Sequence, residues 1–90
     1  MKILEIIWTP EIIEKLERKH SVTADEVEEA CSEPYVHIRK TRESRYLVFG
    51  RTDAGRYLAT VVTYLGGGIV RVITSRDMEI RERDLYQRHL

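Results

Sequence analysis

Two arginines near the end of the chain are the residues whose type and spacing most directly suggest chemistry. Arg71 stands inside the β-branched run IVRVIT, and Arg76 follows where this strand is expected to pass into a charged helix. A period of two puts Arg71 on one face with Ile69 and Ile73, and Thr74 on the other. The arginine guanidinium is a planar fork that binds phosphate or carboxylate through two N–H groups. The two arginines therefore predict contact with an anion.

The charge of the chain is unevenly distributed, although the formal net charge is zero. Residues 1–38 hold four basic and nine acidic residues, which gives −5, whereas residues 39–90 hold eleven and six, which gives +5. All but one of the basic residues in the second part are arginine. Two interpretations stay open: an acidic helical layer that neutralises a basic sheet, or a sheet face that binds RNA or an acidic protein segment.

Length and composition exclude several classes of protein. Ninety residues, 42% hydrophobic and 33% charged, predict a single small folded domain over residues 1–90. No apolar run approaches the roughly 20 residues of a membrane span, so we expect a cytoplasmic protein with no membrane partner. The single cysteine, Cys31, excludes an internal disulfide. No acidic cluster has the spacing for magnesium and no His/Cys set fits zinc, so we expect neither a metal nor another cofactor.

The elements that must position the arginines begin with a strand and two helices. Residues 2–8 alternate as a strand. Thr9 and Pro10 are a helix cap and a first helical residue, and the helix that they begin runs to His20. Residues 23–26, TADE, form a capping box for a second helix. This first part of the chain predicts a helical layer.

From residue 35 the hydrophobic period changes to two. Tight turns rich in glycine separate the predicted strands, at residues 35–40, 45–51, 56–65 and 69–74. A charged helix follows, which Ser75 or Asp77 can cap, supported by acid–base pairs four apart such as Glu79 and Arg83. The fold class is therefore α+β, with a strand, two helices, an antiparallel meander and a C-terminal helix. We expect residues 45–76 to form one antiparallel sheet with the first two helices on one face.

Several short motifs resemble those of a known family, in the same order and spacing. They are IIW at 6–8, KHSV at 19–22, FGR at 49–51, GR at 55–56, RVITSR at 71–76 and ERDLY at 82–86. With these motifs the chain resembles the BrnT toxins of bacterial toxin–antitoxin pairs, which are small ribonucleases with a RelE-like fold. The resemblance covers essentially the whole chain. It departs from the family pattern at Thr9 and Ser21, where the family usually has aspartate and glycine.

The resemblance implies that the chain cleaves RNA without a metal ion, through attack of the 2′-hydroxyl. Such a reaction needs a base for the 2′-hydroxyl proton, cations for the phosphoryl charge and an acid for the leaving 5′-oxygen. The implied catalytic residues are His20 as acid or base, and Arg71 and Arg76 as the cations. The implied RNA contacts are Lys19, Arg51 and Tyr86.

Plainer roles exist for three of these residues. His20 also suits the end of a helix, where the helix dipole favours a histidine. Arg71 could instead pair with Glu5 inside the sheet, and Tyr86 could pack its ring on the sheet.

The resemblance also implies a tightly bound antitoxin, which in the family is a ribbon-helix-helix DNA binder, and a complex that represses its own operon. We expect the antitoxin to cover the arginines of the basic part. Two alternatives stay open: a catalytically degenerate RNA- or protein-binding module on the same fold, and a structural protein whose arginines face an acidic protein segment only. The sequence does not decide between a dimer and a toxin–antitoxin hetero-oligomer.

Overall fold

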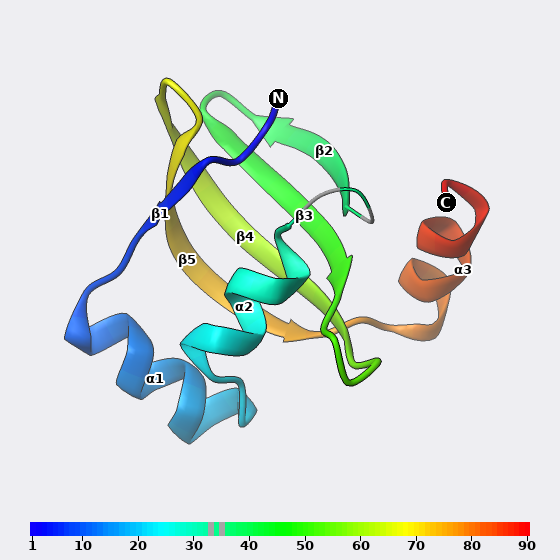
Figure 1. The fold of residues 1–90 in the computed structure, drawn as a ribbon, viewed down its shortest axis with the longest axis horizontal. Coiled ribbons are helices and arrows are strands. Elements are labelled where there is room, and N and C mark those ends of the chain that lie inside the picture. The colour runs from blue at the N-terminus through cyan, green and yellow to red at the C-terminus, as the bar shows by residue number, and fades with distance from the viewer. Residues whose placement is uncertain (33, 35) are drawn as a thin grey trace.

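The computed structural model describes residues 1–32, 34 and 36–90 and shows a mixed α+β domain (Figure 1). Its elements are β1 (Glu5–Ile7), α1 (Pro10–His20), α2 (Ala24–Ala30), β2 (Val36–Arg42), β3 (Arg45–Arg51), β4 (Tyr57–Gly66), β5 (Ile69–Asp77) and α3 (Ile80–Arg88). The predicted order of a strand, two helices, a meander and a final helix is confirmed. None of the helices in these described ranges is long and apolar enough to cross a membrane.

The five strands form one sheet in the order β1-β5-β4-β3-β2. Strands β2 to β5 are antiparallel neighbours, which confirms the predicted meander. Strand β1 is shorter than the predicted strand at 2–8 and joins one edge of the sheet parallel to β5. Strand β2 begins at Val36. The predicted strand start at Tyr35, and Glu33 in the segment before it, lie outside the described residues.

The helices begin at their capping residues, with one correction to the prediction. Thr9 accepts a hydrogen bond from the backbone of Ile12, and Thr23 makes the reciprocal bonds of a capping box, as predicted. The third helix begins at Ile80 and not near Asp77, because β5 keeps its pairing with β4 through Asp77. Its cap residue is Glu79 and not Ser75 or Asp77.

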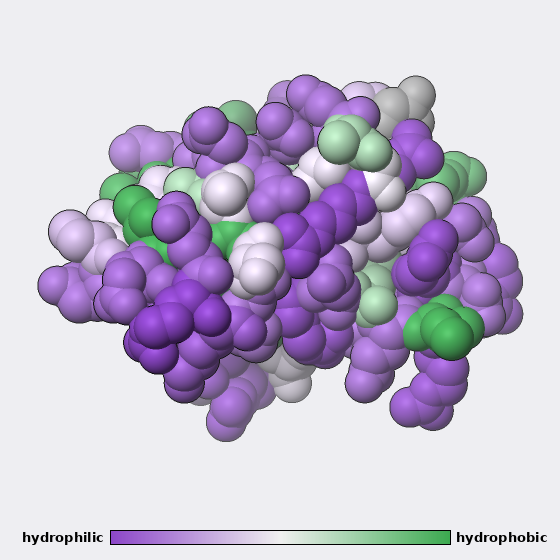
Figure 2. Space-filling model, turned by 90° about the horizontal axis from the view of Figure 1, so that it is seen from below, coloured by the Kyte–Doolittle hydropathy of each residue, from purple (hydrophilic) through white to green (hydrophobic). Residues whose placement is uncertain are grey.

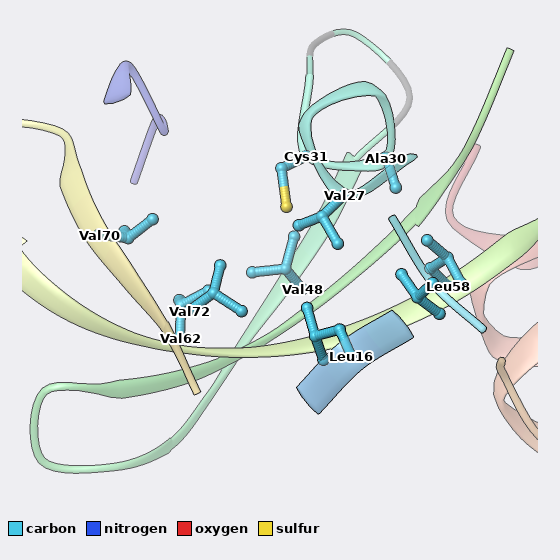
Figure 3. Packing of buried hydrophobic residues seen from close by; sticks show 10 residues of the cluster. Leu16, Val27, Ala30, Cys31, Val48, Leu58, Val62, Val70 and Val72 are labelled. Carbon is cyan, nitrogen blue, oxygen red and sulfur yellow. The ribbon is translucent and has the colours of Figure 1, made fainter. Parts of the chain in front are cut away.

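Apolar side chains cover both faces of the sheet, and different helices lie on each. Helices α1 and α2 pack on one face, which we call the α1/α2 face, around a buried cluster (Figure 3) that includes Leu16, Val27, Val48, Leu58, Val62, Val70 and Val72. Helix α3 packs on the other, the α3 face, where Tyr86 contacts Phe49, Ala59 and Met78. The predicted packing of the first two helices on one face is therefore confirmed.

A β-bulge interrupts the alternation of β5. Val62 of β4 pairs with Val72, but the preceding Val61 pairs with Thr74, so Ile73 is an extra residue in β5. Val62 belongs to the α1/α2 face, and its neighbour Val61 points the other way. Thr74 therefore lies on the α3 face, and the simple alternation predicted for it was wrong.

The bulge places both arginines of β5 on the same face. Strict alternation would send Arg71 and Arg76 to opposite faces, because five residues separate them. Arg71 lies between Val70 and Val72, whose side chains point to the α1/α2 face, so its own side chain points to the α3 face. Arg76 pairs with Ala59, which belongs to the α3 face. The α3 face therefore carries both arginines.

Helix α2 approaches the sheet closely at a glycine near the end of β3. A Cβ atom at Gly50 would lie 1.6 Å from the backbone oxygen of Ala30. Any side chain there would push α2 away from the strand. Gly50 therefore fixes the distance between α2 and the end of the sheet that carries the site described next.

Candidate active site at one end of the sheet

Arg56, the residue before β4, is the centre of a polar network at one end of the sheet. Its Nε and Nη2 donate to the two carboxylate oxygens of Asp77, at 2.7 and 3.1 Å. Its Nη1 donates to the two carboxylate oxygens of Glu26, at 3.2 and 3.3 Å. The same guanidinium also donates to the backbone oxygens of Ser21 and His20, at 2.6 and 3.1 Å. Arg56 therefore joins the end of α1, the first turn of α2 and the end of β5.

The network keeps its members charged. Hydrogen bonds from Arg56 lower the pKa of Asp77, and the charge of His20 acts in the same direction. A hydrogen bond from the backbone of Thr23 lowers the pKa of Glu26, and Arg56 adds to this effect. Hydrogen bonds to Asp77 in turn raise the pKa of Arg56. At neutral pH one guanidinium thus binds two carboxylates.

The turn after α1 brings His20 into this network. Ser21 ends the helix in the left-handed conformation, with φ of 53°, a position where glycine is usual. The turn lets the backbone oxygens of His20 and Ser21 accept hydrogen bonds from Arg56. The His20 side chain is half-buried and lies near enough to Asp77 for its charge to act on that carboxylate. A histidine and a carboxylate are therefore neighbours at the end of β5.

A hollow of about 290 Å³ lies beside the network, lined by Gly55, Arg56, Tyr57, Asp77, Met78 and Arg83. Its size is near the lower end of small-ligand pockets, about 300 Å³. The network borders it on one side and α3 borders it on the other. Figure 2 shows the molecule from this end of the sheet, where the surface is mainly hydrophilic.

Arg76 projects to the α3 face, where a carboxylate of α3 binds its guanidinium. Its Nη1 and Nη2 donate to the two carboxylate oxygens of Glu82, at 2.7 and 3.0 Å. These bonds raise the pKa of Arg76 and lower that of Glu82. The Arg76 side chain is still 40% exposed. Arg76 is therefore charged and reachable from solvent, but a carboxylate already binds it.

Three of the other predicted residues are exposed and lie apart from one another. Arg71 lies five residues before Arg76 in β5, a separation of about 15 Å at the usual rise of a strand. The two arginines therefore do not reach one phosphate together. Lys19 is exposed on α1, and Arg51 is exposed at the end of β3, where it pairs with Tyr57 of β4.

Tyr86 is placed differently from the RNA contact that the resemblance implied. Its side chain is fully buried, and its ring packs edge-on against that of Tyr57, with the centroids 6.0 Å apart. A ring buried in this way has no face on which a base can stack. The structure supports the packing role that the sequence left open, and the site proposed below omits Tyr86.

His20 and Arg76 approach the same end of β5 from opposite sides of the sheet. Helix α1, which carries His20, lies on the α1/α2 face, and Arg76 points to the α3 face. Asp77, next to Arg76, contacts the network around His20. The structure thus brings His20 and Arg76 to one end of the molecule and leaves Arg71 away from it.

Comparison with known proteins assigns the family. The sequence profile described as "Ribonuclease toxin, BrnT, of type II toxin-antitoxin system" matches residues 8–82. The chain belongs to the BrnT family. Its fold is similar to that in the 1.1 Å crystal structure of the Brucella abortus ribonuclease toxin BrnT, with a TM-score of 0.68 and 22% sequence identity over 84% of this chain and 97% of that chain. A search of curated proteins finds no match.

Membership of the BrnT family confirms the resemblance seen in the sequence. It makes the chain a ribonuclease toxin of the type II toxin–antitoxin class, and this class implies an RNA substrate and an antitoxin partner. The likeness to the Brucella structure supports the fold.

Sequence reasoning missed three residues of this BrnT site: Arg56, Tyr57 and Arg83. The sequence analysis named Arg56 only as part of a family motif and gave it no role. Its carboxylate partners lie 21 and 30 residues away in the chain, so no local spacing indicates them. Arg83 was predicted to pair along its helix with Glu79, but its guanidinium lies over the ring of Tyr57, 4.2 Å from the centroid. The doublet Arg56-Tyr57 after a hairpin turn was the available signal.

Proposed function

We propose that the protein is a ribonuclease toxin that cleaves RNA by attack of the 2′-hydroxyl on the adjacent phosphate, without a metal ion. The observation that carries this proposal is the network in which Arg56 binds Asp77 and the backbone of His20, beside a hollow that Arg56, Asp77 and Arg83 line. The reaction needs a proton acceptor, positive charge on the phosphoryl oxygens and a proton donor, all close to one phosphodiester. The end of the sheet offers groups for each task.

His20 is the proposed general base. Its backbone oxygen accepts a hydrogen bond from Arg56, which also binds Asp77, so the residue stands near a carboxylate at the end of β5. An imidazole in this place can accept the proton of the 2′-hydroxyl. The residue is half-buried and therefore still open to a substrate.

Arg76 is the proposed cation for the scissile phosphate. Its bidentate bond to Glu82 has the geometry that a phosphate would use, so a bound phosphate replaces or shares that partner. Arg71, about 15 Å away along the strand, suits a neighbouring phosphate of the same RNA. Arg51 and the exposed Lys19 add positive potential at the two borders of the site.

Arginine is proposed to stabilise the negative charge in place of a metal ion. Within the described part of the chain, no three His, Cys, Asp or Glu side chains gather where they could hold a metal ion. The acidic groups of the site are also engaged, since Asp77 and Glu26 bind Arg56, and Glu82 binds Arg76.

The proposed antitoxin carries an acidic segment that binds the α3 face and, as in the family, a ribbon-helix-helix DNA-binding part. A second hollow, of about 240 Å³, lies on this face, with Leu47, Phe49 and Leu85 as its apolar lining and Arg39, Arg81, Glu79 and Glu82 as its charged residues. An apolar floor with Arg39 and Arg81 beside it suits an amphipathic segment whose acidic side chains pair with these two arginines. The resulting complex is a toxin–antitoxin hetero-oligomer in the cytoplasm.

A second candidate function is a binding module that keeps the fold without cleavage. The bond between Arg76 and Glu82 is the observation that favours it, because that carboxylate fills the fork that a scissile phosphate needs. The two candidates predict different outcomes in one experiment.

The test is single-turnover cleavage of a labelled RNA by purified, antitoxin-free protein in the presence of a chelator. Loss of one transition-state donor typically costs a hundredfold or more in rate. We therefore expect about this loss for Arg76→Ala and nearly as much for Arg76→Lys, because a lysine lacks the fork. His20→Ala should cause a similar loss and flatten the pH–rate profile near neutrality. Arg18→Ala, in an exposed helix pair with Glu14, is the matched control and should cleave normally.

The outcomes separate the candidates. Full activity of both the His20 and Arg76 variants would remove these residues from the mechanism. A wild-type protein that binds RNA but leaves it intact would support the binding module. Cleavage that stops when the chelator is added would contradict the metal-independent reaction.

A further inference from the structure

The hydroxyl of Tyr57 is surrounded by hydrogen-bond donors from two elements. Nε2 of Gln87 in α3 donates to it at 3.3 Å. Arg51 pairs with Tyr57 across β3 and β4, and the guanidinium of Arg83 in α3 lies over the tyrosine ring. Two cations and an amide around one phenolic oxygen favour the form of tyrosine that has lost its proton.

The ring that carries this hydroxyl is held on two sides. The guanidinium of Arg83 lies 4.2 Å from the ring centroid, and the buried ring of Tyr86 packs edge-on, 6.0 Å away. The backbone is fixed as well, since the oxygen of Tyr57 accepts a hydrogen bond from Met78 at 3.0 Å. The side chain is nevertheless only half-buried and lines the hollow of about 290 Å³. The hydroxyl therefore has a defined position at a surface that a substrate can reach.

The position of Tyr57 complements that of His20. Arg56, which binds Asp77 and the backbone oxygen of His20, lines the hollow together with Asp77, and Tyr57 and Arg83 line the side next to α3. In an in-line displacement the attacking and leaving oxygens lie on opposite sides of the phosphorus atom, so the base and the acid must approach from opposite sides. The role proposed here therefore requires a phosphodiester that lies between the His20 side chain and the Tyr57 hydroxyl.

We propose that Tyr57 is a further catalytic residue, the general acid that protonates the leaving 5′-oxygen; this role rests on the ribonuclease function proposed above. His20 takes the proton of the 2′-hydroxyl, the 2′-oxygen forms a bond to phosphorus, and the bond from phosphorus to the 5′-oxygen breaks. The 5′-oxygen takes the proton of Tyr57. The products are a 2′,3′-cyclic phosphate and a 5′-hydroxyl, and the imidazolium of His20 returns a proton to the tyrosinate through solvent.

The surroundings of Tyr57 suit an acid of this kind. The hydrogen bond from Gln87, followed by the contact with Arg51, lowers the pKa of Tyr57 below its ordinary value. A general acid works best when its pKa lies near the working pH, because it is then still protonated and releases its proton readily. The two arginines also hold positive charge beside the tyrosinate that forms.

A substrate with an altered leaving group tests this role directly. In a 5′-phosphorothiolate RNA, sulfur replaces the leaving 5′-oxygen, and a thiolate leaves without a proton. Tyr57→Phe keeps the ring, and therefore the packing of Arg83 and Tyr86. We expect Tyr57→Phe to cleave the normal RNA at least about a hundredfold more slowly than wild type, and the phosphorothiolate RNA within a few-fold of wild type. Tyr46→Phe, in the sheet on the other face, is the matched control and should cleave both substrates normally.

The pH dependence gives a second measurement. With the normal RNA, the wild-type rate should fall at high pH as Tyr57 loses its proton, and this fall should be absent in Tyr57→Phe. Equal slowing of both substrates by Tyr57→Phe would assign the residue to binding or structure and overturn the proposal, and so would an unchanged rate on the normal RNA. If wild type cleaves neither substrate, the proposed ribonuclease function fails and the role of Tyr57 falls with it.

Discussion

Replacement of Arg56 by alanine should destabilise the protein by roughly 3 kcal/mol. A buried hydrogen bond to a charged group contributes about 1.5–3 kcal/mol. An exposed ion pair contributes at most about 1 kcal/mol. The ion pair with Asp77 contributes no more than an exposed pair, at most about 1 kcal/mol, because the Asp77 side chain is 65% exposed. Glu26 and Arg56 are 29% and 26% exposed, so their pair contributes more. The bonds to the backbone of His20 and Ser21 add only about 0.5 kcal/mol each, because the Arg56 side chain is still 26% exposed. These contributions together give the estimate.

A loss of this size is large for a chain of this length. Stability of roughly 0.05–0.15 kcal/mol per residue corresponds to about 5–13 kcal/mol for 90 residues. For a domain of this size, about 3 kcal/mol lowers Tm by on the order of 15 °C. Arg56→Lys should lose about half as much, because an ammonium keeps the charge but cannot bind two carboxylates and two carbonyls at once.

Urea unfolding followed by circular dichroism measures these differences. The midpoint should fall in the order wild type, Arg56→Lys, Arg56→Ala, with an unchanged slope. Arg18→Ala is again the control, because Arg18 and Glu14 form an exposed pair whose side chains are 59% and 68% accessible, and its effect should stay within about 0.5 kcal/mol. If Arg56→Ala is no less stable than this control, the network does not hold the three elements together and the reasoning is refuted.

Two further predictions concern pH and salt. Burial, together with the charges of His89 and Arg39, lowers the pKa of His37, whose ring stacks on that of His89 at 4.2 Å. As pH falls, the unfolded chain therefore binds a proton at His37 before the folded chain does. The stability that neutral His37 contributes is complete above about pH 6.5 and is lost as pH falls through the folded-state pKa. In urea unfolding His37→Asn should lose less stability at low pH than wild type, and an equal loss in the variant would contradict this prediction. Association with the antitoxin should slow by about tenfold or more as salt rises, because charge steers it to the α3 face, and a rate that salt does not change would locate the binding surface elsewhere.

Much of the fold could be predicted because its signals are local in the sequence. Thr9 with Pro10, and Thr23 with Glu26, mark two helix starts within four residues each. The strands alternate over short windows, and the family motifs supply their order. The start of α3 was missed for a physical reason. Ser75 and Asp77 are good caps by residue type, but pairing with β4 extends β5 past both positions.

The site was less predictable because long-range contacts build it. The bulge at Ile73, which moves Arg76 to the face of Arg71, depends on the pairing of β5 with β4, and the sequence of β5 alone does not indicate it. The burial of Tyr86 likewise depends on where α3 docks. The chemical types of His20 and Arg76 could be recognised from the sequence, but their approach from opposite sides of the sheet could not.

The last two residues of β5 connect the two helical layers. Neighbours in a strand point to opposite faces, so Arg76 binds Glu82 of α3 while Asp77 binds Arg56 and, through it, α1 and α2. A movement of α3 therefore acts on Arg76 directly. It also acts on Tyr57, because Arg83 on the same helix contacts the tyrosine ring. A partner that binds α3 can in this way change the fork of Arg76 and the position of Tyr57 together, while the network of Arg56 keeps His20 in place. The proposed antitoxin surface and the proposed phosphate contact of Arg76 therefore both lie on the α3 face.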